Sequence, residues 1–197
     1  MSISATCSRL AAGTAALLLL GSPEYLRAQI SLQEALTAAF PPPAEVERKT
    51  AFLDPQDLAA IRTAAGEDAP VTQRVVSYYM ATRGGKPLGV AYFDSHRVRT
   101  LNEVVMIVVE PADSTGSDRI RSIEVLRFAE PPEYHASDAW LNQFKGRPLS
   151  RGLSLKGSIS NMTGATLTSN AIVRAARRVL ATHQRIRPWA AVPRTAH

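Results

Sequence analysis

Met-Thr-Gly-Ala-Thr-Leu-Thr-Ser, at residues 162–169, is the most informative stretch of the chain, because a run with helical periodicity follows it directly. Helix N-termini present unpaired backbone N–H groups and the positive end of a dipole, and both suit phosphate. Gly164 and Ala165 allow a ligand to approach the backbone closely. The hydroxyls of Thr166 and Thr168 can donate to a phosphate oxygen or be esterified. The stretch therefore predicts a phosphate-binding turn, with an ordinary Ser/Thr-rich helix cap as the alternative.

The same residues resemble the flavinylation motif of the FMN-binding domain family, which reads Ser/Thr-Gly-Ala-Thr followed by a second Thr. The family includes the RnfG and NqrC subunits of bacterial redox complexes that are coupled to sodium ions or protons. The resemblance implies a covalent FMN, joined through its phosphate to the hydroxyl of Thr166. It also implies that the other residues of the motif contact the cofactor: Thr163, Gly164, Ala165, Leu167 and Thr168.

Further segments extend the resemblance beyond the motif. Residues 140–146 (Trp-Leu-Asn-Gln-Phe-Lys-Gly) are similar to a Trp-x-x-Gln-Phe-x-Gly segment that precedes the flavin motif in RnfG-type proteins. Residues 130–133 (Glu-Pro-Pro-Glu) stand where those subunits carry Glu-Thr-Pro-Gly, which implies a flavin contact for Glu130. Residues 94–100 (Asp-Ser-His-Arg-Val-Arg-Thr) resemble a segment of small exported FMN-binding-domain proteins, which match the chain better overall.

One residue departs from the family pattern. The flavin transferase is a Mg²⁺-dependent enzyme that takes FMN from FAD, and its recognition pattern normally has an Asp six residues before the acceptor Thr. This chain has Ser160 there. An Asp in that place can cap the turn or meet the metal site of the transferase, whereas Ser can replace only the cap. The resemblance thus implies the transferase as a partner, and it leaves open whether Ser160 prevents flavinylation.

Residues 1–29 combine a weakly positive start at Arg9 with an apolar stretch from Leu10 to Leu20. This pattern predicts an export signal or an uncleaved N-terminal anchor, and hence a protein of the periplasm or the outer face of the cytoplasmic membrane. Cys7 is the only cysteine and lies within this leader. Removal of the leader excludes disulfides, zinc thiolate sites and cysteine-ligated iron–sulfur clusters, so redox chemistry requires a bound cofactor.

The net charge of +6 is unevenly distributed, because no Asp or Glu follows Asp138 while ten Lys and Arg residues do. Nucleic acid is not expected as a partner, since an exported chain meets little of it and aromatic residues do not alternate with the basic ones. Attraction to a phosphate ligand, an anionic membrane surface or an acidic redox partner fits this charge better. A solvated basic helix face is the alternative for most of these residues taken singly.

The order of the predicted elements indicates an α+β fold, with helices packed on a mostly antiparallel sheet. Strands are predicted at residues 46–53, 71–82, 88–93, 104–109 and 120–128, with 104–109 as a central strand. Helices are predicted after capping residues Ser31, Asp54 and Ser137 and from about Ser169, with an unstructured chain beyond about His183. A single FMN-binding domain over residues 30–186 follows, between the leader at 1–29 and a disordered tail at 187–197.

We expect an exported flavoprotein that relays electrons between membrane redox proteins and a periplasmic acceptor, rather than an enzyme with a substrate of its own. Neither catalytic residues nor metal ligands are predicted. His96 is interpreted as a polar surface group at a strand end, with a proton relay as the less favoured reading. Two alternatives stay open: a binding or regulatory module that holds FMN non-covalently, and a flavin-dependent reductase of a small acceptor.

Overall fold

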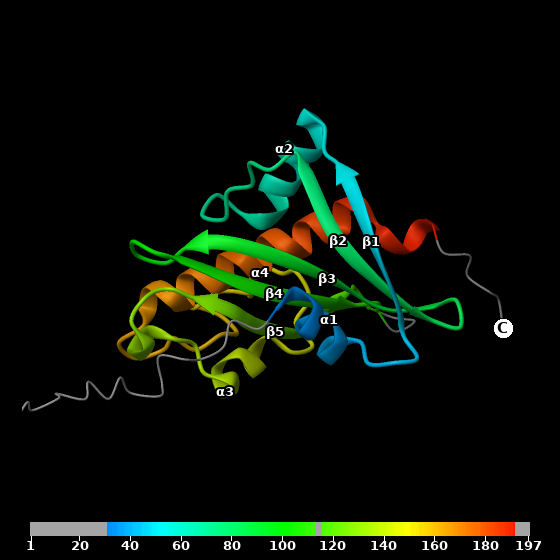
Figure 1. The fold of residues 1–197 in the computed structure, drawn as a ribbon. Helices are drawn as coiled ribbons and strands as arrows, with labels where there is room; N and C mark the ends of the chain where they lie inside the picture. Colours follow the sequence, from blue (N-terminus) through cyan, green and yellow to red (C-terminus); the bar gives the residue numbers. More distant parts are fainter. Residues whose placement is uncertain (1–30, 113–115, 192–197) are drawn as a thin grey trace, which may run out of the picture.

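Five strands form one antiparallel meander in the computed structural model, which describes residues 31–112 and 116–191 (Figure 1). Each strand pairs with its neighbours in the chain, so the sheet order is β1-β2-β3-β4-β5. The fold is the predicted α+β arrangement, with a sheet that is antiparallel throughout. The strands are β1 (Glu45–Phe52), β2 (Val75–Arg83), β3 (Lys86–Arg97), β4 (Asn102–Glu110) and β5 (Arg119–Phe128).

Helices α1 (Leu32–Ala39) and α2 (Pro55–Ala65) begin at the predicted caps. The side chains of Ser31 and Asp54 each accept a hydrogen bond from the third backbone N–H of their helix, and an acidic side chain returns the bond. These capping boxes satisfy two otherwise unpaired N–H groups per helix. Gly66, with φ at 94°, ends α2 in a conformation that glycine adopts without strain.

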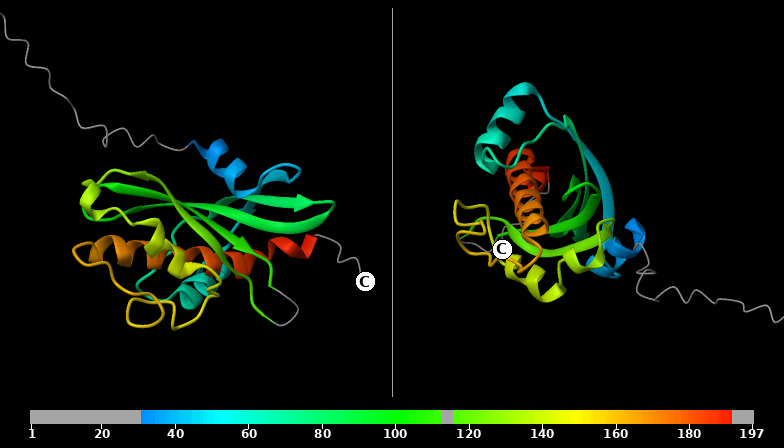
Figure 2. Two further views of the ribbon diagram at one scale, coloured as in Figure 1. Left: turned by 90° about the horizontal axis from the view of Figure 1, so that it is seen from below. Right: turned by 90° about the vertical axis from the view of Figure 1, so that its left-hand side faces the viewer.

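Helices cover both faces of the sheet (Figure 2). The long helix α4 (Thr166–Ile186) lies along the concave face, and its apolar side packs on a cluster that includes Val105 and Ile107 of β4. Helix α1 packs on the opposite face against Met106 and Val108. The sequence predicts β4 as central, but the middle strand is β3. Residues 104–109 of β4 are all apolar because this strand is covered on both faces, which does not require the middle position.

Strands β2 and β3 separate from each other along their length. Their register runs from Arg83↔Lys86 to Tyr78↔Tyr92 and ends there. Beyond that pair, residues 75–77 of β2 continue alongside β1, and residues 93–97 of β3 continue alongside β4. The sheet therefore forks, and α4 passes beneath the opening between the two branches (Figure 1).

Regular structure continues past His183, where the sequence predicts the tail to begin. α4 runs to Ile186, and Pro188–Ala191 form a 3₁₀ helix. His183 is completely buried and bridges the hydroxyl of Tyr92, 2.9 Å from Nδ1, to the carboxylate of Asp118, 2.9 Å from Nε2. Trp189 donates to the same carboxylate at 3.0 Å. Polar anchors of this kind are invisible to hydrophobic periodicity, which explains the early end of the predicted helix.

The remaining helix of the described chain is α3 (Asp138–Leu141), which a 3₁₀ turn extends over Asn142–Phe144. Ser137 caps it as predicted. Within residues 31–112 and 116–191, no helix has the length and apolar character needed to cross a membrane. The predicted leader at 1–29 lies outside the described residues.

Candidate functional site

The predicted phosphate-binding turn lies at the N-terminus of α4, and that helix begins three residues earlier than the sequence indicates. Thr166 is the first helical residue, and Ala165 at the N-cap provides no side-chain hydrogen bond. The sequence predicts the start near Ser169, just before the apolar face that includes Ile172 and Val173. In the structure the Ser169 hydroxyl instead donates to the carbonyl of Ala165 at 3.1 Å, inside the first turn. The first turn therefore presents uncapped N–H groups of the kind that bind anions.

Thr166 is exposed, and space is open around it. Its Oγ1 accepts a hydrogen bond from Nδ2 of Asn161 at 2.9 Å. Gly164 has φ at 80°, and no atom of the described residues lies within 4 Å of the position that a Cβ would take there. Thr163 is exposed as well, and Leu167 is 50% exposed. A ligand can therefore reach the Thr166 hydroxyl without displacing the protein.

The next two hydroxyls of the motif point into the protein. Thr168 is 1% exposed, and its Oγ1 has no hydrogen-bond partner within the described part of the chain. Ser169 is completely buried, but its Oγ accepts from the N–H of Met162 at 3.2 Å in addition to its bond to Ala165. A buried polar group without a partner costs about 1–3 kcal/mol, so the Thr168 hydroxyl requires an explanation.

Ser160, the residue that departs from the family pattern, is held through its backbone. Its carbonyl accepts from Nε1 of Trp140 at 2.6 Å, and its N–H donates to the side-chain oxygen of Gln143 at 2.8 Å. Trp140 is itself buried and meets the ring of Phe144 edge-on. The segment at 140–146 thus positions the loop that leads to the motif, and an Asp at position 160 would make the same two backbone bonds.

Glu130 anchors the turn between β3 and β4. Its Oε1 accepts hydrogen bonds from the N–H groups of Arg99, Thr100 and Leu101 at 3.0, 2.7 and 2.8 Å. These backbone bonds, of which that from Leu101 contributes most, lower the pKa of Glu130. The turn and the N-terminus of α4 lie toward the same end of the sheet, on the left of Figure 1. Glu130 therefore has a structural role at this end, and its direct contact with a flavin stays a prediction.

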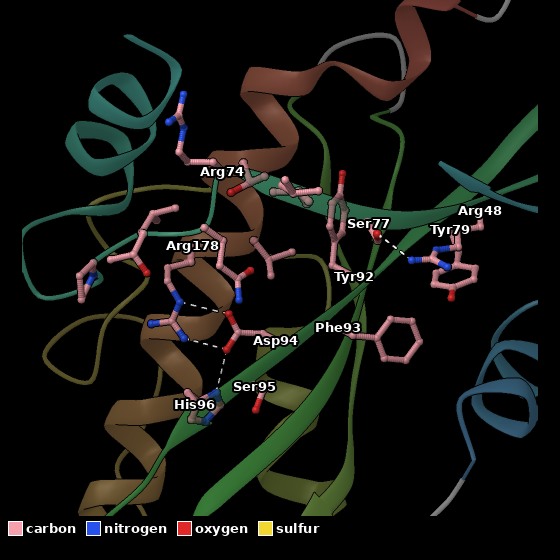
Figure 3. A pocket seen from close by; sticks show the side chains of 18 of the residues that line it. Arg48, Arg74, Ser77, Tyr79, Tyr92, Phe93, Asp94, Ser95, His96 and Arg178 are labelled. Atoms are coloured by element: carbon pink, nitrogen blue, oxygen red, sulfur yellow. Dashed lines mark hydrogen bonds and ion pairs between the residues drawn. The ribbon is translucent and has the colours of Figure 1, made fainter. Parts of the chain in front are cut away.

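His96 is not the surface group that its strand-end position suggests. Its side chain is 9% exposed, with Nδ1 2.8 Å from Oδ1 of Asp94 (Figure 3). Its Nε2 lies 2.9 Å from Oε2 of Glu103. Arg178 of α4 binds both oxygens of Asp94, through Nε at 3.1 Å and Nη2 at 2.7 Å. Burial acts to lower the pKa of His96, but the bonds to Asp94 and Glu103 outweigh it and raise this pKa. The sequence signal is the spacing of Asp94 and His96, which puts both on one face of a strand.

A family model described as the FMN-binding domain matches residues 104–181, from the start of β4 to near the end of α4. Residues 104–181 belong to the FMN-binding domain family. The match includes the turn at 162–169, and the chain is therefore a flavin-binding protein. No curated protein and no solved structure was found to match the chain.

The turn at the start of α4 fits the phosphate end of FMN. Its uncapped backbone N–H groups and the amide of Asn161 are donors for a phosphate beside the exposed Thr166. No Asp or Glu occurs in the sequence after Asp138, so the motif itself carries no side chain that repels a phosphate. An FMN-binding domain needs such a donor set at one end of the cofactor.

Proposed function

We propose that this FMN-binding protein is exported, carries FMN covalently on Thr166, and relays electrons between membrane redox proteins and an acceptor outside the cytoplasmic membrane. The observation that carries the proposal is the exposed Thr166 hydroxyl at the uncapped N-terminus of α4, inside the matched domain. When bound, the isoalloxazine ring supplies the capacity to store and release electrons.

The residues of the turn hold the phosphate end of the cofactor. The N-terminus of α4 places unpaired N–H groups and the positive end of a 21-residue helix beside Thr166. A negative group in this position gains about 0.3–1 kcal/mol from the helix dipole. Asn161 already donates to Thr166 Oγ1, so its amide stays within reach of a phosphate joined to that oxygen. The motif therefore supplies recognition and charge compensation.

Attachment transfers the FMN group of FAD to the hydroxyl of Thr166. A bond forms between Thr166 Oγ1 and the phosphorus of the FMN half of FAD, the pyrophosphate bond of FAD breaks, and AMP leaves. The hydroxyl proton passes to a base of the transferase. Metal ion and transferase activate the hydroxyl, because an isolated Thr is a weak nucleophile at neutral pH. The described contact of the Thr166 side chain is the Asn161 amide, which is not a base.

A relay explains the covalent linkage better than a reductase does, because a tethered cofactor stays with the protein through repeated cycles. Export is supported by the apolar leader, and an anionic membrane or an acidic redox partner is supported by the basic half of the chain. The non-covalent alternative rests on Ser160, which stands where the transferase normally meets an Asp. Its prediction is a flavin that dialysis removes from the protein.

The test is co-expression of the exported protein with a flavin transferase, followed by intact-mass measurement and ultraviolet fluorescence on a denaturing gel. We expect a fluorescent band whose mass has risen by FMN less one water. Thr166→Ala should abolish both signals, and the matched control Thr63→Ala, at an exposed threonine of α2 outside the motif, should keep them. Flavin retained by Thr166→Ala would move the attachment site. A dark wild-type band would contradict the covalent proposal and favour the non-covalent module.

A further inference from the structure

The fork between β2 and β3 opens into a groove of about 820 Å³ whose floor is α4. Its walls come from five elements: α1 through Leu32, β1, β2 with the loop before it, β3, and α4 (Figure 3). A groove of this size falls within the range of small-molecule sites. The part of α4 that lines the groove begins at Arg178, twelve positions beyond Thr166. This is about 18 Å along a helix that rises 1.5 Å per residue.

A chain of buried ionic groups leads to the groove. Glu103, which is completely buried, contacts His96 in the directly opposite position on the neighbouring strand, and His96 in turn contacts Asp94. Asp94 holds the Nε and Nη2 atoms of Arg178, and the third nitrogen of that guanidinium lies on the side away from Asp94 (Figure 3). Each contact thus fixes the orientation of the next group, and the last one borders the groove.

This network costs more free energy than a purely structural contact between α4 and the sheet requires. Glu103 Oε1 has no hydrogen-bond partner among the described residues, and apolar side chains already pack α4 on the sheet nearby. Replacing a buried ion network by apolar groups is often neutral or stabilising. What apolar packing cannot do is hold a guanidinium at a set position and angle, which is how proteins recognise carboxylates and phosphates.

We propose that the groove is a second ligand site, and that it binds a small organic oxyanion: an apolar body that carries a carboxylate or a phosphate. Arg178, held by the network, binds the oxyanion. Arg74, from the loop before β2, and Arg48, from β1, add positive charge to the groove. Arg48 donates a 3.1 Å hydrogen bond to Ser77. Asp94 is the one acidic residue in the described lining, and Arg178 and His96 already compensate it.

The rest of the lining suits the apolar body of such a ligand. Val75 and Val179 border the groove. Tyr79 and Phe93 also border it, with their rings on the side of the fork that faces α1, away from Arg178 (Figure 3). The groove therefore combines an apolar surface with a fixed positive group, which is the usual composition of an organic-anion site. The proposal concerns residues away from the α4 N-terminus, so it does not depend on covalent attachment of FMN.

The probes are benzoate, phenyl phosphate and the neutral isostere benzamide, titrated at constant ionic strength into the protein expressed without flavin transferase. Binding is followed by two-dimensional amide NMR. We expect saturable shifts for one of the two anions at residues 94–96, 74–77 and 178, and none for benzamide. The tighter anion distinguishes a carboxylate ligand from a phosphate ligand.

Four variants locate the binding energy. Arg178→Gln should weaken binding on the order of tenfold, the value of one charge-assisted hydrogen bond, and Arg178→Lys should restore only part of it. Arg74→Gln should also weaken binding, and because Arg74 is exposed this variant keeps the test valid if Arg178→Gln does not fold. Arg174→Gln, on the same helix but outside the groove lining, is the matched charge control and should bind as wild type does.

Three outcomes would overturn the proposal. Wild-type protein could show no saturable shift with either anion, benzamide could bind as well as benzoate, or Arg174→Gln could lose as much affinity as Arg178→Gln and Arg74→Gln. The last result would mean that bulk positive charge, and not the groove, attracts the anion. Failure of flavinylation at Thr166 would leave all three readings of this experiment unchanged, so the two proposals fail separately.

Discussion

Thr168→Val should stabilise the flavin-free protein, although it replaces a polar residue of the motif. The Thr168 hydroxyl is 1% exposed and has no hydrogen-bond partner in the described structure, whereas valine keeps the shape without the polar atom. Removing an unsatisfied buried group recovers about 1–2 kcal/mol of the free energy of unfolding. For a domain of this size that corresponds to a rise of about 2–8 °C in Tm. The assay is urea unfolding followed by far-ultraviolet circular dichroism, with the m-value checked for constancy.

The neighbouring hydroxyl provides a control of opposite sign. Ser169→Ala removes the acceptor of the Met162 N–H and should lower the free energy of unfolding by about 1 kcal/mol. A Thr168→Val protein less stable than wild type by 1 kcal/mol or so would refute the reasoning, because it would show that the hydroxyl has a partner in the native protein.

Three other predictions concern Ser160, Glu130 and His96. Ser160→Asp should raise the fraction of flavinylated protein by intact mass without changing Tm, because the contacts of residue 160 are made by its backbone; a lower fraction would show that this Asp is not what the transferase reads. Glu130→Ala should speed amide hydrogen exchange at residues 99–101, because its carboxylate accepts their N–H groups. In wild type, the protection of these amides should fall as the pH drops below 4.5 and through the lowered pKa of Glu130. Unchanged exchange in the variant would contradict the anchoring role of Glu130. The pKa of His96 is raised above 6.5 in the folded protein, so its stabilisation is complete below that pH and is lost as the pH rises through the folded pKa. The difference in unfolding free energy between wild type and His96→Gln should therefore be larger at about pH 6 than at about pH 9, and a difference that grows with pH would contradict the network.

Local chemistry made most of the fold predictable. Capping residues such as Ser31 and Asp54 act within one helical turn, so their effect can be read without knowledge of the tertiary structure. The Gly84-Gly85 turn likewise fixes a hairpin between neighbouring strands. The match at residues 104–181 confirms the family to which the motif around Thr166 points, since the motif is a continuous stretch.

The parts that could not be predicted depend on contacts between distant residues. His96 meets Glu103 across a strand pair and Arg178 through Asp94, more than eighty positions away along the chain. The spacing of Asp94 and His96 shows that they share a face of the strand, but not that the cluster is buried. The same holds for His183, whose partners Tyr92 and Asp118 come from other parts of the fold. The predicted start of α4 also differs from the observed one, because the bond of the buried Ser169 within the first turn cannot be distinguished from a cap in the sequence.

The order of the elements has a consequence for the biogenesis of the protein. Every strand of the meander can pair as soon as the next one has been synthesised, but α4 comes last and covers the apolar face that β3 and β4 expose until then. Thr166 begins that same helix, so the turn proposed to carry FMN takes its shape only when α4 docks. A transferase that requires this shape would recognise the folded turn as well as its sequence. Attached flavin would then mark molecules that have completed their folding, and trapped intermediates would stay colourless.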